Sequence, residues 1–303
     1  MSTIYQVGNG NYSKYEPREL VDLILNTQNK NRVAIFDLDG TIHKGIWPER
    51  FSGVTNADLA FYLTYEILIK NIFTRKTLIE QFSKFHSNLK HLLYINREVE
   101  EYKKEKNLSS IGSDAESSQL EAKLIEYFAQ NVLSGLSEQS VKNASYKIVK
   151  HSYPKAKECI KEIADDSSKT FFISKAFEPV LEAYQKNLKE NYDADVEIIG
   201  NKLLTYYHII IGLDKENAIL TGEDKAEELK KIISSYNSSI IFGDSYEDLG
   251  MFMLSDDILG KENTLKIAIN PKSDELKENS DAVFKDWVSL EQIIRENSWK
   301  DKA

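Results

Sequence analysis

Short apolar runs alternate with amphipathic stretches over most of this chain. The runs at 32–37, 169–174, 238–243 and 265–269 each give way to polar or glycine residues, a pattern typical of buried strands. Apolar residues at helical spacing predict helices at about 17–26, 154–166, 177–190, 222–234 and 245–254. Strands separated by helices of this length need crossover connections. The pattern therefore predicts an α/β fold with a Rossmann-like parallel sheet core and helices on both faces.

The stretch from 46 to 150 departs from this alternation because it contains no convincing strand. Its apolar residues follow one another in steps of four, three, four and three, which trace one face of a helix: Leu78, Phe82, Phe85, Leu89 and Leu92. We therefore expect two domains. Residues 1–45 and 151–303 form the α/β core, and residues 46–150 form an all-helical cap domain inserted after the first strand.

Composition narrows the classes of partner. The chain has 303 residues, with 39 Lys and Arg against 48 Asp and Glu, which gives a formal net charge of −9. Proteins that track the phosphates of nucleic acids normally carry the opposite sign. No apolar run approaches the roughly 18 residues of a membrane span, and the one cysteine excludes an intramolecular disulfide. We expect a cytoplasmic protein with neither nucleic-acid nor membrane partners.

The segment FDLDGT, at the end of the first apolar run, carries the sharpest chemical signal. Residues two apart in an extended chain point the same way, so Asp37 and Asp39 are expected to project toward one pocket. Two carboxylates at such a short distance repel each other unless a cation lies between them. A calcium loop would need Gly and Glu where this chain has Ile42 and Pro48, so that alternative fails. An acidic turn that only caps the strand remains an alternative.

Two further segments supply groups suited to holding an anion. Ser174 ends the run FFIS, and the residues after it are expected to begin a helix whose free N–H groups attract anions. Lys225 lies in the first turn of the helix in TGEDKA, where a lysine is unfavourable against the helix dipole unless an anion is near. A plain helix cap at Ser174 and an ordinary lysine-rich surface at Lys225 remain open.

A fourth segment, IIFGDSYEDLGMF, brings two more carboxylates to the end of a strand. Asp244 follows the apolar run immediately, and Asp248 lies one helical turn further on, so both are expected to face the same site. All four segments fall where strands of an open parallel sheet terminate, which is where such sheets bind ligands.

These motifs in this order resemble the haloacid dehalogenase superfamily of phosphohydrolases, and more closely its phosphoserine-phosphatase-like branch, which has a helical cap after the first motif. The resemblance rests on DLDGT at 37–41, Ser174, Lys225 within GEDKA, GDSYED at 243–248 and INP at 269–271. It implies a Mg²⁺-dependent phosphomonoesterase that acts on a small phosphorylated metabolite through an aspartyl-phosphate. The presence of Asp39 favours a phosphatase over a dehalogenase.

The resemblance also implies a role for each motif residue. Asp37 is the nucleophile and Asp39 the general acid and base, while Ser174 and Lys225 bind the phosphoryl oxygens. The implied magnesium ligands are a carboxylate oxygen of Asp37, the backbone carbonyl of Asp39 and the carboxylate of Asp244. Asp248 is implied to support these ligands without binding the ion directly. The cap is expected to select the substrate, and Trp47, Glu49 and Arg50 are candidates for contacts with its head group, with packing within the cap as the alternative for Trp47.

Two other functions remain open at this stage. A phosphotransferase would pass the phosphoryl group to an alcohol instead of water, and the motifs do not separate the two. A non-catalytic binding or regulatory protein of the same fold would be expected to lack one of the motif residues, and none is missing. Outside the motifs, we expect His43 to be a satisfied surface histidine, and Cys159 and Trp287 to be packing residues.

Overall fold

The structure is a computed structural model, and it describes residues 5–6, 10–25, 31–45, 55, 58–63, 90–91, 94, 97–102, 104–105 and 115–298. Among these residues no helix is long and apolar enough to cross a membrane.

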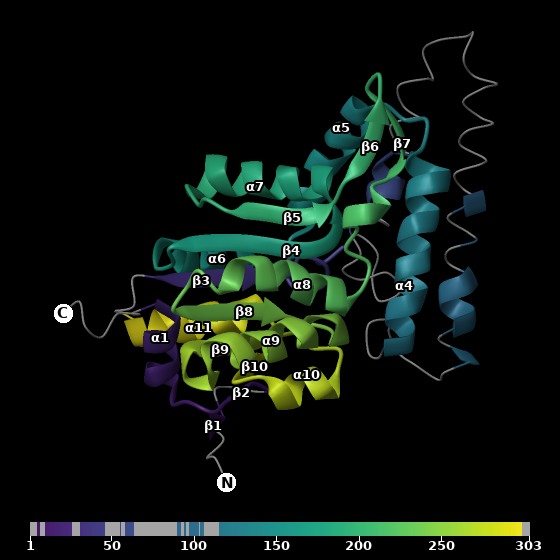
Figure 1. Ribbon diagram of the computed structural model, residues 1–303. Coiled ribbons are helices and arrows are strands. Elements are labelled where there is room, and N and C mark those ends of the chain that lie inside the picture. Colours follow the sequence, from purple (N-terminus) through teal and green to yellow (C-terminus); the bar gives the residue numbers. More distant parts are fainter. Residues whose placement is uncertain are drawn as a thin grey trace.

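A mostly parallel sheet forms the centre of the molecule (Figure 1). Its strand order is β1-β2-β10-β9-β8-β3-β4-β5, and the six strands from β10 to β5 are all parallel. The bounds are β1 (Tyr5–Gln6), β2 (Tyr12–Ser13), β3 (Arg32–Phe36), β4 (Lys169–Phe177), β5 (Glu197–Asn201), β8 (Ser238–Gly243), β9 (Thr264–Ile269) and β10 (Ala282–Phe284). The expected parallel α/β core is confirmed.

Register aligns the ends of the central strands. Phe36, the last residue of β3, pairs with Phe172 of β4 and with Phe242 of β8. The ring of Phe36 stacks on that of Phe242 with centroids 4.6 Å apart, which fixes this register by side-chain packing. The residues that follow Phe36 and Phe242 therefore leave the sheet at one edge, side by side.

Alternation along the buried strands divides the core into two layers. On β3, Ala34 and Phe36 face one layer, and Val33 and Ile35 face the other. The first layer is covered by α1 (Pro17–Leu25), α6 (Ala156–Asp165), α7 (Glu178–Tyr192) and α11 (Trp287–Ser298). The second is covered by α8 (Gly222–Ile233), α9 (Leu249–Leu259) and α10 (Asp274–Asn279). The sheet is thus closed on both faces, as parallel sheets require.

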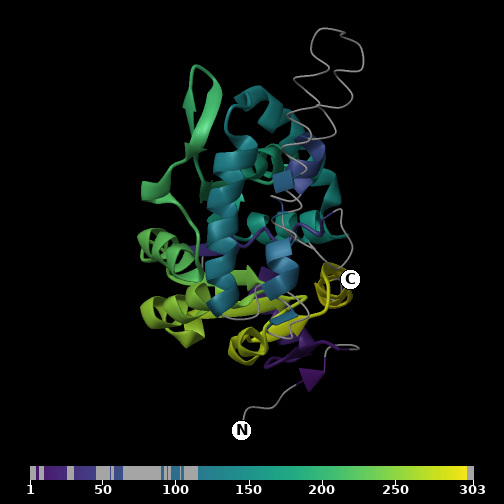
Figure 2. The same ribbon diagram turned by 90° about the vertical axis from the view of Figure 1, so that its right-hand side faces the viewer.

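The described part of the 46–150 stretch is helical. It includes α4 (Ala115–Phe128), the π-helical η1 (Ala129–Leu133), α5 (Glu138–Ile148) and the start of η2 (Val149–His151). Helix α4 stands across the end of the sheet toward which the arrow of β5 points (Figure 1), and it faces the viewer in Figure 2. The predicted helical series from Leu78 to Leu92 lies outside the described residues.

Several features differ from the sequence prediction or add to it. Strand β4 continues to Phe177, so helix α7 begins four residues after Ser174 and not directly after it. Strand β5 and the antiparallel hairpin of β6 (Leu203–Tyr206) and β7 (Ile209–Leu213) were not predicted. Short 3₁₀ helices are η3 (Lys215–Asn217), η4 (Tyr246–Asp248) and η5 (Lys261–Asn263).

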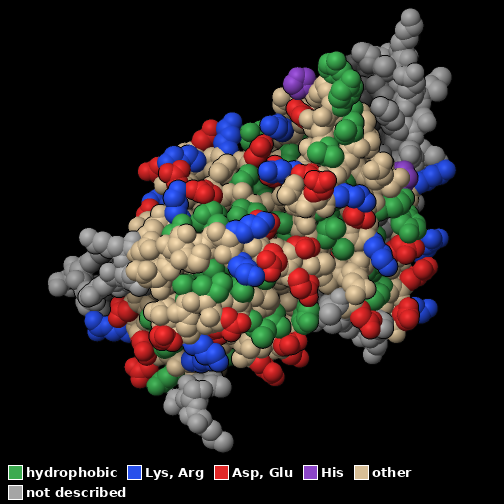
Figure 3. All heavy atoms as spheres, in the orientation of Figure 1, with side chains coloured by type: hydrophobic (Ala, Val, Ile, Leu, Met, Phe, Trp, Pro, Cys, Tyr) green, Lys and Arg blue, Asp and Glu red, His purple; other side chains and the backbone are tan. Residues whose placement is uncertain are grey.

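The surface seen in Figure 3 carries acidic and basic side chains interspersed, without a single-sign field over the core helices. Apolar side chains gather instead on the β6–β7 hairpin, where Leu204, Tyr206 and Tyr207 are exposed.

Candidate active site

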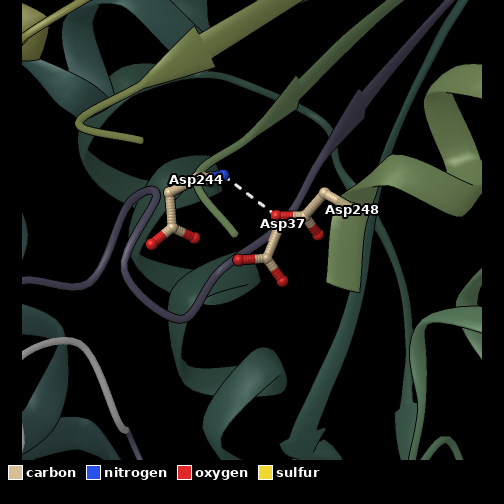
Figure 4. A group of neighbouring side chains, drawn as sticks. All are labelled: Asp37, Asp244 and Asp248. Carbon is tan, nitrogen blue, oxygen red and sulfur yellow. Dashed lines mark hydrogen bonds between the residues drawn. The ribbon is translucent and has the colours of Figure 1, made fainter. Parts of the chain in front are cut away.

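Three buried aspartates converge at the edge where the central strands end. Asp37 follows β3, Asp244 follows β8, and Asp248 closes η4 at the start of α9 (Figure 4). One carboxylate oxygen from each lies within 4.8 Å of the others. Sequence reasoning predicted this convergence, and the structure brings all three together.

Lys225 joins two of these aspartates. Its Nζ donates hydrogen bonds to Asp37 Oδ1 at 2.7 Å and to Asp248 Oδ1 at 2.8 Å. Burial opposes the charged ammonium, but the two carboxylates outweigh it and raise the pKa of Lys225 well above its ordinary value. The helix start that presents Lys225 is fixed by a capping box between Thr221 and Asp224.

Asp248 uses both of its oxygens to organise the site. Besides Lys225 on Oδ1, its Oδ2 accepts hydrogen bonds from Asp244 N at 2.9 Å, Ser245 N at 3.1 Å and Ser245 Oγ at 3.3 Å. Burial alone would raise the pKa of Asp248, yet Lys225 and these donors hold it below the ordinary value. Asp248 therefore holds Lys225 and the Asp244 backbone in place and has little capacity for a further ligand.

Asp37 and Asp244 keep capacity for a cation. Thr41 Oγ1 lies 3.2 Å from Asp37 Oδ2 and 3.1 Å from Asp244 Oδ1, and a hydroxyl with one hydrogen can donate to only one of them at a time. Burial raises the pKa of Asp37 well above its ordinary value, against the opposing effect of Lys225. Burial likewise raises the pKa of Asp244 to about 6. A divalent ion would stabilise both carboxylates, and all-oxygen donors suit Mg²⁺.

Gly40 lets the loop after β3 approach this pair closely. Its φ is +84°, and a Cβ placed there would lie 2.1 Å from Asp244 Oδ2 and 2.5 Å from Lys272 Nζ. Lys272 is a site residue that sequence reasoning missed. Its Nζ pairs with Asp244 Oδ2 at 2.8 Å, and the only signal in the sequence is its position three residues after the end of β9.

Both carboxylate oxygens of Asp39 accept hydrogen bonds from Thr55. Its Oδ1 accepts a hydrogen bond from Thr55 N at 2.8 Å, and its Oδ2 accepts one from Thr55 Oγ1 at 3.3 Å. Burial raises the pKa of Asp39, although His43 and Thr55 oppose this. Thr55 belongs to the 46–150 stretch, so that stretch contacts a motif residue directly.

His43 is fully buried, so the expectation of a surface histidine is wrong. Its ring nitrogens lie 2.8 Å from Asp58 Oδ2 and 2.8 Å from Tyr184 Oη. The physical reason is that the ring lies between Asp58 of the 46–150 stretch and Tyr184 of α7, and both its nitrogens have partners there.

Ser174 lies at the same edge of the sheet and is buried. Its Oγ accepts a hydrogen bond from Ala176 N at 3.2 Å within the extended end of β4. Helix α7 begins at Glu178, one residue from the predicted start at 177, so its free N–H groups lie beyond Ser174 along the chain.

The residue after Ser174 makes an ion-pair cluster that sequence reasoning did not predict. Lys175 pairs with Glu121 of α4 and, at 3.4 Å, with Glu247 of η4. Burial opposes its charge, but the two glutamates outweigh this and raise the pKa of Lys175. The cluster joins α4 to the end of the sheet that carries the aspartates.

Three predicted substrate residues, Trp47, Glu49 and Arg50, lie outside the described residues. The packing roles expected elsewhere are confirmed. Cys159 and Trp287 are both fully buried, and the Cys159 thiol lies 3.9 Å from the Trp287 carbonyl oxygen.

No protein-family model and no curated protein matches the chain. Among solved structures, cytosolic 5′-nucleotidase IIIB bound to cytidine is similar with a TM-score of 0.57 and 14% identity, over 96% of this chain and 94% of that one. A phosphoserine phosphohydrolase-like protein from Francisella tularensis gives 0.49 and 17%, over 88% and 99%. The HAD-hydrolase YfnB from Bacillus subtilis, bound to magnesium, gives 0.34 and 12%, also over 88% and 99%.

At these identities the similarity concerns the fold. The similarity to cytosolic 5′-nucleotidase IIIB shows that this chain shares the fold of that enzyme.

Proposed function

We propose that this protein is a Mg²⁺-dependent phosphomonoesterase that hydrolyses a small phosphorylated metabolite through an aspartyl-phosphate on Asp37. The observation that carries the proposal is the buried set of Asp37, Asp244 and Asp248, with Lys225 bound between two of them at the end of a parallel sheet. An acidic turn that only caps a strand does not account for a buried lysine shared by two carboxylates from different segments.

In the first step Asp37 attacks phosphorus. A bond forms between its carboxylate oxygen and phosphorus, the bond from phosphorus to the leaving alkoxide breaks, and Asp39 gives that oxygen a proton. In the second step water attacks phosphorus, Asp39 takes a proton from it, and the bond to Asp37 breaks to release inorganic phosphate. A pKa raised by burial suits Asp39, because it retains a proton to give at higher pH.

Lys225 and Ser174 are the proposed groups that bind the phosphoryl oxygens. Lys225 already carries a full charge beside Asp37, so it reduces the repulsion between that carboxylate and an incoming phosphate. Asp248 keeps Lys225 in place, because the Lys225 ammonium donates its second hydrogen bond to Asp248 Oδ1.

The metal is assigned to Asp37 and Asp244, with the backbone carbonyl of Asp39 completing the protein ligands by resemblance. When bound, Mg²⁺ supplies positive charge that neutralises the aspartates and the phosphate together. Asp248 supports this set without ligating, because Lys225 and three donors already occupy its oxygens.

We assign residues 46–150 to a cap domain that admits the substrate. Residues 1–45 and 151–303 then form the core domain. Two contacts from this stretch support the assignment: Thr55 binds Asp39, and Glu121 pairs with Lys175 beside Ser174. Trp47, Glu49 and Arg50 remain the proposed head-group contacts.

The test is hydrolysis of p-nitrophenyl phosphate with and without Mg²⁺, followed by a panel of phosphoamino acids, phosphocholine, sugar phosphates and nucleoside monophosphates. We expect phosphate release only with the metal, and loss of at least about a thousandfold in Asp37→Asn. Glu227→Gln, on the exposed surface of α8, is the matched control. Undiminished turnover in Asp37→Asn would refute the assignment of Asp37 as the nucleophile. Analysis of the products in the presence of an alcohol distinguishes hydrolysis from phosphoryl transfer.

A further inference from the structure

Lys272 is attached to Asp244 at two points. Its backbone N donates to the Asp244 carbonyl oxygen at 2.7 Å, and its Nζ pairs with Asp244 Oδ2 at 2.8 Å. The loop that carries it leaves β9 through Asn270, which has a positive φ of 50° and is anchored by a hydrogen bond from its N to the Phe284 carbonyl oxygen at 2.7 Å. The ammonium is therefore directed at this carboxylate by a fixed backbone.

The two lysines of the site divide the aspartates between them. Lys225 binds Asp37 and Asp248, whereas Lys272 binds Asp244. They also differ in exposure, because the Lys225 side chain is 3% exposed and that of Lys272 is 20% exposed. The Lys272 side chain is thus nearer to solvent than that of Lys225, so its charged end can leave the carboxylate for water more readily.

Space at Asp244 Oδ2 is restricted. The tight approach of Gly40 leaves Oδ2 and the Lys272 ammonium against the loop that follows β3. A divalent ion that ligates Asp244 must either displace this ammonium from Oδ2 or bind close to it. In both cases a positive charge opposes its entry.

We propose that Lys272 is a resident counter-cation of Asp244 that competes with the divalent metal ion and so sets the affinity of the site for it. This inference rests on the proposed function, because it takes Asp244 as a metal ligand. In the absence of the ion, the Lys272 ammonium supplies positive charge beside Asp244, a buried carboxylate that lies near those of Asp37 and Asp248. When the ion binds, the ammonium gives up Oδ2 and moves toward solvent.

The experiment is isothermal titration of MgCl₂ into the full chain, stripped of metal with a chelator and dialysed. We expect Lys272→Met to bind Mg²⁺ at least about fivefold more tightly than the unchanged protein, the lower end of typical coupling between two ligands. Lys272→Arg keeps the charge and is expected to restore the original affinity. Lys266→Met is the matched control. Lys266 lies on β9 and forms a largely buried ion pair with Asp256, which does not belong to the set of Asp37, Asp244 and Asp248.

Thermal unfolding supplies a second measurement. In chelator, Lys272→Met is expected to melt at a lower temperature than the unchanged protein, and saturating Mg²⁺ is expected to narrow the gap. Lys266→Met is expected to keep a constant gap. Equal or weaker Mg²⁺ binding by Lys272→Met would overturn the competition. Absence of Mg²⁺ binding in every variant would instead remove the metal site of the proposed function, and the inference with it.

Discussion

The indole Nε1 of Trp287 donates a hydrogen bond to the carbonyl oxygen of Thr41 across 2.6 Å. The two residues are 246 positions apart, and Trp287 is the first residue of α11. Thr41 in turn places its hydroxyl between Asp37 and Asp244. The last helix that the structure describes thus supports the loop that carries the proposed nucleophile.

Trp287→Phe tests this support. The phenyl ring keeps the stacking against Phe242, whose centroid lies 5.5 Å from that of Trp287, but it leaves the Thr41 carbonyl without its donor. We expect the free energy of unfolding to fall by about 1–3 kcal/mol, as for other buried groups that lose a partner. Chemical denaturation measures this change, and hydrolysis of p-nitrophenyl phosphate is expected to fall with it.

Val288→Ala is the control for Trp287→Phe, because Val288 is the next residue of α11 and is exposed. Its effect is expected to stay within about 0.5 kcal/mol. If both variants unfold alike, the hydrogen bond to Thr41 makes no special contribution.

The core of the fold was predictable because its strands are buried on both faces. The runs at 32–37 and 238–243 are continuous and apolar, and they correspond to β3 and β8 within one residue. The β6–β7 hairpin escaped prediction for a local reason. Its turn residues, Tyr207 and His208, both have positive φ, a conformation that usually selects Asn and Gly, so no typical turn residue marks the hairpin in the sequence.

The site was predictable as far as its residues follow strands directly. Asp37 and Asp244 directly follow strands, and Asp248 lies one helical turn after Asp244, so the sheet brings the three together. Lys272 was not predictable in the same way. Its contact with Asp244 depends on β9 lying beside β8 and on the path of the loop after β9, and neither is encoded in a short motif.

Asp39→Asn tests the proton transfer to the leaving group. An amide at this position cannot donate a carboxylic proton, and only a poor leaving group needs one. We therefore expect kcat/KM for an alkyl phosphate to fall by about a hundredfold or more, and that for p-nitrophenyl phosphate to fall much less. Steady-state kinetics on the two substrates measure the ratio, and equal losses would contradict the acid role of Asp39.

Lys175→Met tests the cluster that joins α4 to the core. The change removes the ammonium with which Glu121 and Glu247 both pair, and Glu247 is almost completely buried. Breaking a buried pair on one side costs about 3–5 kcal/mol of unfolding free energy. Adding Glu247→Gln to Lys175→Met is expected to restore part of this loss, because the uncompensated charge is then gone.

The exposed pair of Lys186 and Glu190 on α7 gives the control for this cluster. Lys186→Met is expected to change the unfolding free energy by no more than about 1 kcal/mol, since exposed pairs contribute little. A cluster variant that behaved like this control, with no recovery in the double variant, would show that the α4 contact does not depend on the buried charges.

The pH dependence of stability reports on Asp244. Burial raises its pKa to about 6 in the folded, metal-free protein, whereas an unfolded chain has a value of 3.8. The folded state therefore binds this proton more tightly, so the contribution is fully present below pH 3.8 and is lost as the pH rises through 6. A pKa difference of this size corresponds to about 3 kcal/mol of unfolding free energy.

In chelator, the unfolding free energy of the unchanged protein relative to Asp244→Asn is expected to fall by about that amount between pH 4 and 7. Denaturant titrations across this range measure the fall, and saturating Mg²⁺, which prefers the ionised carboxylate, is expected to reverse most of it. A difference between the two proteins that stayed constant with pH would mean that Asp244 titrates at its ordinary value despite its burial.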